Sequence, residues 1–268
     1  MHLDIQKSLE SVLVERAQLN QIAEAALSVA RLLMETGAPA KIVHEECRRV
    51  VRGLGAQHVD LRSGYASLDI TIDKGGIDFT RMMEVGPLGV NYRLAHAVRA
   101  LVTQIAEGEL TSAEAISELT RLEKGTARHP PWMVAVATGI ACAAFGRLLG
   151  MDWAAFIPVL ASGSVGQRVR QLLLRHGVNA FVVAGFIAFL ASGLGALGSR
   201  LAGSTTVALA MIASVLLLVP GVPALDAQYD ILEGHPTLGT ARGVVVSMTV
   251  IFMATGVLIS GALLGVLR

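Results

Sequence analysis

The sequence predicts a membrane protein in which a cytoplasmic α+β domain precedes an all-α transmembrane bundle of about five helices. The first observation is the distribution of charge, because 32 of the first 131 residues are charged but only 11 of the last 137. Soluble domains are about 25% charged, so the first part has a soluble composition and the second part has that of a membrane segment. The net charge of +1 gives no field that would attract nucleic acid, and we expect no such partner.

The second observation is the hydrophobic period in residues 1–131, which changes from helical to extended and back. A helical stripe of apolar residues begins at Ile22 and continues to Leu33, and a second helix is expected from Val43 to Leu54. Alternating residues then predict three antiparallel strands, at 59–62, 68–72 and 77–85, with Arg81 as a misfit on the apolar face. Helices return at 94–105 and after Thr111, where a capping-box pattern starts.

The third observation is a series of five apolar stretches in residues 132–268. They predict transmembrane helices at 132–149, 153–174, 178–198, 205–225 and 243–267. Small residues spaced four apart, such as Gly256 and Ser260, would allow these helices to pack closely in lipid. The second stretch runs without charge only to Gly166, which is about 21 Å of helix and less than the ~30 Å core, so its crossing stays open.

The positions of Lys and Arg predict the orientation of the chain. If all five stretches cross and the first domain is cytoplasmic, seven Lys or Arg residues near the spans lie inside and three lie outside. This bias favours a cytoplasmic N-terminus and a periplasmic or extracellular C-terminus. The first residues show no long apolar run and no small-residue cleavage site, so we expect no cleaved signal.

Polar residues at membrane depth are the candidates for a substrate pathway, because ionisable groups there are costly. Gln167 and Arg168 continue the second apolar stretch, and they would face the bundle interior and bind an anion if that helix runs on to Leu174. The alternative is a cytoplasmic helix end with arginines that reach toward water.

A second candidate lies at Pro220-Gly221-Val222-Pro223, which cannot continue a regular helix. Broken helices form substrate and ion sites in transporters. Asp226 and Asp230 follow at a spacing that places them on one helical face, where they could bind a cation, relay protons or pair with Arg168 or Arg242. The alternative is a cytoplasmic loop with ordinary acidic residues.

The sequence contains no catalytic, metal or cofactor motif that we can recognise. Cys47 and Cys142 lie far apart, and the His44-Glu45 pair does not continue as a zinc-protease motif because position 48 is Arg. We therefore expect a protein that is not an enzyme and that holds neither metal nor cofactor.

Several motifs resemble those of the bacterial threonine/serine exporter family, over about residues 22–268. The resemblance is carried by the Pro220–Pro223 break and by short segments on both sides of it, namely Leu33-Met34-Glu35-Thr36-Gly37-Ala38, Leu54-Gly55-Ala56, Gly108-Glu109-Leu110-Thr111, Asp230-Ile231-Leu232-Glu233-Gly234 and Gly239-Thr240-Ala241-Arg242. Fused members of this family carry a second hydrophobic half, so this chain resembles the split form, which is related to a two-subunit succinate exporter.

The resemblance implies a subunit of a secondary transporter in the bacterial inner membrane. It would export threonine and serine or a dicarboxylate such as succinate, driven by the proton gradient, and it would work with a second small membrane subunit, or as a homo-oligomer if that partner does not exist. The expected pathway residues are Gln167, Arg168, Pro220, Gly221, Pro223, Asp226 and Asp230. The alternative is a membrane-bound sensor or scaffold whose soluble domain binds a ligand or protein.

Overall fold

The chain divides into two units, which are described separately below. The computed structural model describes residues 2–74, 77–126 and 129–266. The first unit takes in the chain up to residue 127 together with residues 222–243, and the second takes in residues 128–221 and 244–268. The segment that follows the Pro220–Pro223 break is therefore part of the same unit as the N-terminal residues.

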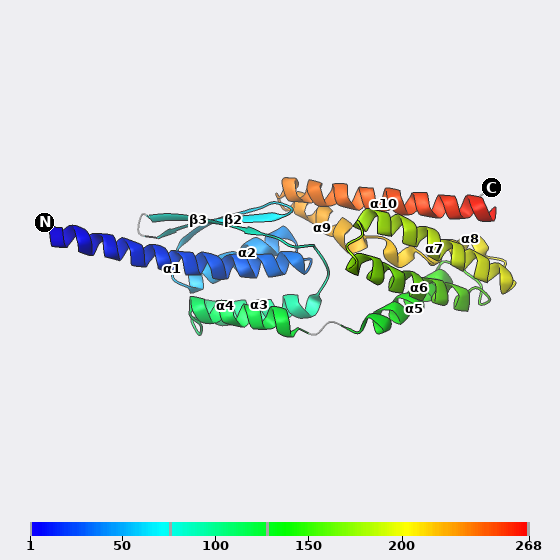
Figure 1. Ribbon diagram of the computed structural model, residues 1–268, viewed down its shortest axis with the longest axis horizontal. Helices are drawn as coiled ribbons and strands as arrows, with labels where there is room; N and C mark the ends of the chain where they lie inside the picture. Colours follow the sequence, from blue (N-terminus) through cyan, green and yellow to red (C-terminus); the bar gives the residue numbers. More distant parts are fainter. Residues whose placement is uncertain (1, 75–76, 127–128, 267–268) are drawn as a thin grey trace. The chain divides into compact units, whose positions relative to one another are not determined.

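The first unit is built around α1 (His2–Glu35), whose second half is its central element (Figure 1). From Leu19 to Met34 most α1 side chains are fully buried, and many of them are alanines, which let neighbours approach on several sides. α2 (Ala40–Gly53), α3 (Tyr92–Ala106) and α4 (Ser112–Gly125) pack against it. The capping box expected at Thr111 is confirmed, since its backbone N–H donates to the Glu114 carboxylate at 2.8 Å.

The sheet of the first unit is the expected antiparallel meander, in the order β1-β2-β3. Its strands are β1 (His58–Ser63), β2 (Ser67–Lys74) and β3 (Ile77–Glu84), with Leu61 opposite Ile70. Leu68, Ile70 and Ile72 are fully buried, and β2 and β3 pack against α1. The misfit Arg81 finds polar partners on α1, because it donates to Asn20 at 2.5 Å and Glu24 at 3.1 Å.

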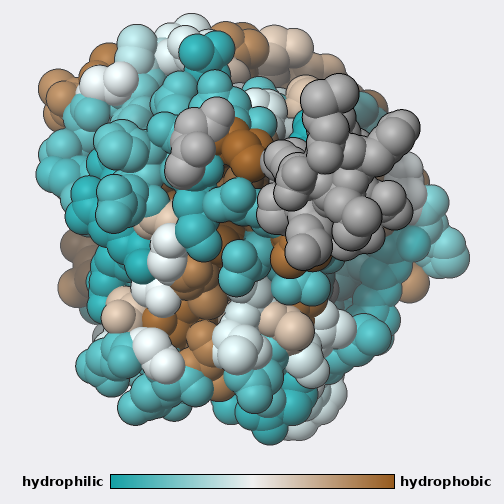
Figure 2. Space-filling model, turned by 90° about the vertical axis from the view of Figure 1, so that its left-hand side faces the viewer, coloured by the Kyte–Doolittle hydropathy of each residue, from teal (hydrophilic) through white to brown (hydrophobic). Residues whose placement is uncertain are grey.

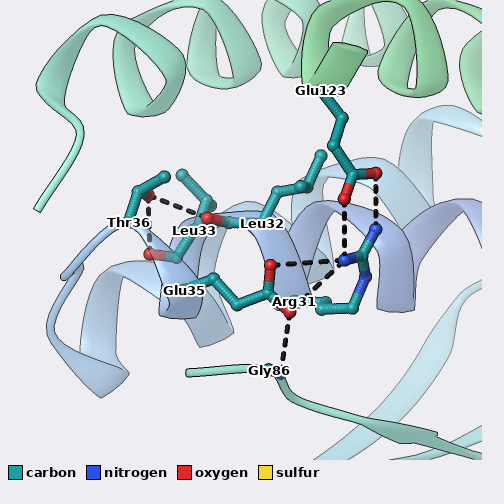
Figure 3. A network of polar contacts seen from close by, with 7 residues as sticks. All are labelled: Arg31, Leu32, Leu33, Glu35, Thr36, Gly86 and Glu123. Atoms are coloured by element: carbon teal, nitrogen blue, oxygen red, sulfur yellow. Dashed lines mark hydrogen bonds and ion pairs between the residues drawn. The ribbon is translucent and has the colours of Figure 1, made fainter. Parts of the chain in front are cut away.

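A polar network connects α1 with α4 and with the loop after β3 (Figure 3). Arg31 donates to Glu35 at 3.2 Å and to Glu123 at 2.8 Å, and Glu35 accepts the backbone N–H of Gly86 at 2.8 Å.

Figure 2 shows one face of the protein on which hydrophilic residues surround a narrow hydrophobic strip.

The second unit consists of helices, three of which are long and apolar enough to cross a membrane among the residues that the structure describes. These are α5 (Pro131–Leu148), α7 (Ala180–Leu201) and α10 (Pro236–Leu264). α6 (Phe156–Arg175) has 20 residues, but its last eight include three arginines. α10 begins in the first unit and continues into the second.

Glycines bring the helices of the second unit into close contact, as their spacing predicts. A side chain at Gly256 of α10 would collide with the backbone of α7 at Gly185 and Phe189, and one at Gly139 of α5 would collide with Ser164 and Leu160 of α6. These crossings therefore tolerate no larger residue without a backbone shift.

The fourth apolar stretch does not form one helix. It is divided into α8 (Val207–Ala213), a 3₁₀ turn at Leu216–Leu218 and the start of α9 (Gly221–Leu232). The helix cannot continue through Pro220, because proline has no N–H and would clash with the carbonyl four residues earlier, but α8 has already ended at Ala213, before the reach of that clash. It resumes at Gly221 with Pro223 in the first turn, where the missing N–H has no intrahelical partner to lose.

Candidate functional site

A small cavity of about 10 Å³ lies between the helices of the second unit. It is large enough for about one water molecule and far smaller than a carboxylic acid solute. The lining mixes apolar and uncharged polar residues, namely Thr138, Cys142, Gly163, Gly166, Gln167, Ile187, Ala191, Ser214 and Leu218. In this conformation the bundle therefore leaves no room for such a solute at this cavity.

Two buried hydroxyl groups connect α6 with the turn after α8 beside this cavity. The Ser162 hydroxyl donates to the Ser214 hydroxyl at 2.8 Å, and Ser214 donates to the carbonyl of Ala210 at 2.8 Å. Ser214 also lies so close to Gly195 of α7 that any side chain there would collide with it. Neither serine was among the expected site residues, although the small-residue spacing that includes Ser162 and the expected Gln167 both pointed to this region.

Gln167 and Arg168 lie on different sides of α6. Gln167 lines the cavity, as expected, whereas Arg168 is exposed and donates weakly to Gln171 at 3.4 Å. The expectation that both face the interior of this bundle is wrong for Arg168. The reason is helix geometry, since successive residues of an α-helix point about 100° apart.

The residues after the break form an elbow, which we define as residues 222–243 and which packs within the first unit. Gly221 and Pro223 are exposed at the start of α9 and Pro220 is half-buried, while Asp226 is half-buried and Asp230 is fully buried one turn later. Burial and the nearby Asp230 carboxylate raise the pKa of Asp226, and Arg242 acts in the opposite direction.

Asp230 and Arg242 form a buried ion pair inside the elbow, which is one of the pairings expected from the sequence. The Arg242 guanidinium donates to Asp230 at 2.6 Å, and the exposed fractions of the two side chains are 4% and 0%. The other Asp230 oxygen accepts the backbone N–H of Ala40 at 2.8 Å, at the first residue of α2. Arg242 also donates to the carbonyl of Ala38 at 3.3 Å.

Further contacts attach the elbow to the N-terminal residues, and no sequence pattern predicted them. Leu238 is 1% exposed and belongs to the same hydrophobic core as α1. Lys41 pairs with Glu233 at 2.8 Å, and the rings of His44 and His235 lie 4.5 Å apart. These partners are separated by about 190 residues in the sequence, so no local pattern could reveal them.

Within the described ranges, the structure brings together no group of three His, Cys, Asp or Glu side chains that could hold a metal ion. The second unit has a single Asp or Glu in its sequence, Asp152. That carboxylate accepts from the backbone N–H groups of Thr205 and Ala155 at 2.8 and 3.0 Å and from the Ser204 hydroxyl at 2.9 Å. It therefore connects the segment after α7 with the residue before α6.

Comparisons with known proteins identify related sequences. A family model described as "Putative threonine/serine exporter" matches residues 24–264. A "Probable succinate transporter subunit YjjP" of Klebsiella aerogenes is 27% identical over 94% of this chain and 97% of its own length. The protein of the same description from Escherichia coli K12 is 28% identical over 85% of this chain and 89% of its own length. No solved structure matches the chain.

A family match over residues 24–264 covers both units, including the break and the elbow. Together with three apolar helices of membrane-spanning length among the described residues, it assigns the chain to the membrane and to transport rather than to enzymatic catalysis. The chain belongs to the threonine/serine exporter family of membrane transporters.

Proposed function

We propose that this chain is one subunit of a secondary transporter in the bacterial inner membrane, which exports a dicarboxylate or a small amino acid with the proton gradient as its energy source. The family description supports threonine and serine, and the names of the two relatives support succinate. The first unit would lie in the cytoplasm and the C-terminus on the other side of the membrane.

The observation that carries this proposal is the large uncovered apolar surface of the second unit. Only 17% of the most apolar stretch of α10 is buried, and Ile251, Leu258 and Leu263 are each more than half exposed. Such surfaces are stable against lipid or against other membrane helices. Transporters are often built from two related bundles around a central site, so a second subunit is the expected neighbour.

We propose that the expected pathway residues divide by role. Gln167 at the cavity and Arg168 on the exposed side of α6 would contact the carboxylate of the solute at successive points of its path, because the two side chains point in different directions. Pro220, Gly221 and Pro223 would interrupt the helix at the break, so that backbone groups there are available to the solute. Asp226 and Asp230 follow the break, and Asp226 is the better proton carrier because its raised pKa brings protonation closer to neutral pH.

A cell-based export assay tests this proposal. Cells of the native host that lack this gene are loaded with succinate, threonine or serine, and efflux is followed with and without the full chain supplied in trans. We expect the chain to restore efflux of one of these solutes, and a protonophore to slow that efflux. Equal efflux with and without the chain for every solute would reject the transport function.

The need for a second subunit is tested in liposomes. Purified full-length chain is reconstituted alone and together with the membrane protein that co-purifies with it from the native host. We expect solute movement only with both proteins. Full transport by the chain alone would reject the partner and favour a homo-oligomer.

A further inference from the structure

The elbow is held to the first unit by a buried pair of opposite charges. Asp230 is 0% exposed and Arg242 is 4% exposed. Removing two charges from water is expensive, and an apolar replacement of a buried ion pair is often as stable. The pair therefore contributes little to folding stability. It does hold the elbow in one position, since each charge has a particular bonding partner.

Each member of the pair is also bonded to the backbone that leads into α2. Asp230 accepts the N–H of Ala40, at the positive end of the α2 dipole, and Arg242 donates to the carbonyl of Ala38. The guanidinium Nε is buried and has no hydrogen-bond partner among the described residues. Asp230 is the carboxylate that bonds Arg242 directly, and removing either member of the pair would leave the other buried charge without its bonded partner.

Apolar packing makes the elbow rigid between these two charges. A side chain at Gly239 would lie 2.7 Å from the Ala227 carbonyl and 2.6 Å from Ile231, so α9 and the start of α10 are in close contact. Leu238, beside Gly239, enters the core of the first unit. The boundary between the two units falls directly after Gly221, so the rigid elbow starts at the break itself.

We infer that Asp230 and Arg242 are positioning residues for transport. They anchor the elbow to α2, so that the rest of the first unit fixes the start of α9 at the break. This inference rests on the proposed transport function, and it gives the first unit a mechanical role in transport. Neither residue contacts the solute. Loss of the anchor slows the transport cycle without changing how well the solute binds.

Two measurements on the full-length chain test the anchor, with Asp230→Asn as the main variant. In hydrogen exchange, the Ala40 amide should exchange about a hundredfold faster in this variant, because breaking a buried pair shifts such an equilibrium by that order. In the export assay, its maximal rate per protein in the membrane should fall about tenfold or more, while the solute concentration for half-maximal export stays within about twofold. Asp230→Glu, which keeps the charge, should recover part of the rate.

Glu46→Gln is the matched control, because Glu46 is also a buried carboxylate of the first unit. It pairs with Arg49 and Arg99 at 2.8 and 3.0 Å and has no bond to the elbow. It should leave exchange at Ala40 and the export rate within about twofold of the unmodified chain. If Asp230→Asn does not reach the membrane, Leu238→Ala loosens the same contact without a stranded charge and should give the same selective loss of maximal rate.

Three results would overturn the inference. The first is unchanged exchange at Ala40 in both elbow variants, and the second is an equal loss of rate in Glu46→Gln. The third is a raised half-saturation concentration with an unchanged maximal rate in Asp230→Asn, because that pattern means direct contact with the solute. If the unmodified chain exports none of the solutes, the transport function fails, while the exchange measurement still decides whether the anchor exists.

Discussion

His44 should make the first unit less stable in mild acid, and the size of the effect follows from its burial. Its ring is 8% exposed, lies against His235 and is 3.1 Å from the Ser63 hydroxyl. Burial, together with the charges of His235 and Arg48, lowers its pKa from 6.5 to about 4, although Asp60 acts in the opposite direction.

The direction of the effect follows from the pH at which the folded and the unfolded chain each bind the proton. The unfolded chain protonates His44 below about pH 6.5 and the folded chain only below about pH 4, so stability is complete at neutral pH and falls between these values. A pKa difference of about 2.5 corresponds to about 3.4 kcal/mol once both states are protonated. At about pH 5.5 the loss is about 1.4 kcal/mol.

The assay compares unmodified protein with His44→Gln, which keeps a polar side chain near Ser63 but does not titrate. Urea unfolding of the first unit is followed in detergent between about pH 7.5 and pH 5. Because groups other than the neighbouring His235 titrate alike in both proteins, the difference between their unfolding free energies reports the titration of His44 together with its coupling to His235. Between neutral pH and about pH 5.5, the unmodified protein should lose about 1.4 kcal/mol more unfolding free energy than His44→Gln. Two curves that run parallel would refute the reasoning.

Three other predictions concern the membrane helices, the proton and a thiol. Gly256→Val should separate α10 from α7, since even a Cβ would lie 2.8 Å from the Phe189 nitrogen. We expect the free energy of unfolding in detergent to fall by about 1–3 kcal/mol. The control Gly243→Val, where a Cβ meets open space, should leave it unchanged. Asp226→Asn should abolish the response of export to a proton gradient, and unchanged proton-driven export would remove Asp226 as the carrier. The Cys47 thiol is buried and its pKa is raised to about 12, so in a Cys142→Ala background it should react with maleimide only after unfolding; rapid labelling of the native protein would contradict this.

Local patterns in the sequence predicted much of the fold because they reflect short-range physics. The alternation at 68–72 indicated a strand with one buried face, and Leu68, Ile70 and Ile72 are fully buried. The capping box at Thr111 depends on residues three apart and is present. Prolines at the break interrupt the helix as expected, although the interruption already begins after Ala213.

Long-range pairing could not be predicted, and this determined the outcome for the candidate site. The acidic residues after the break were expected from their spacing to share a face, and Arg242 was one of two possible partners for them. In the structure Asp230 pairs with Arg242, and its other oxygen accepts the Ala40 N–H, which lies 190 residues away in sequence. Gln167 lines the cavity and Arg168 does not, and composition could not separate two adjacent residues whose direction is set by the rotation of α6.

The elbow also determines what can be removed from this protein. A shortened chain that began at residue 132 would retain Leu238, Asp230 and Arg242 but would lack the core and the α2 backbone that receive them. An aliphatic side chain and two charges would then be exposed to solvent with no native contact. Truncation at the apparent junction between the hydrophilic and hydrophobic halves therefore cuts through one folding unit, and a membrane half produced alone would be prone to aggregation.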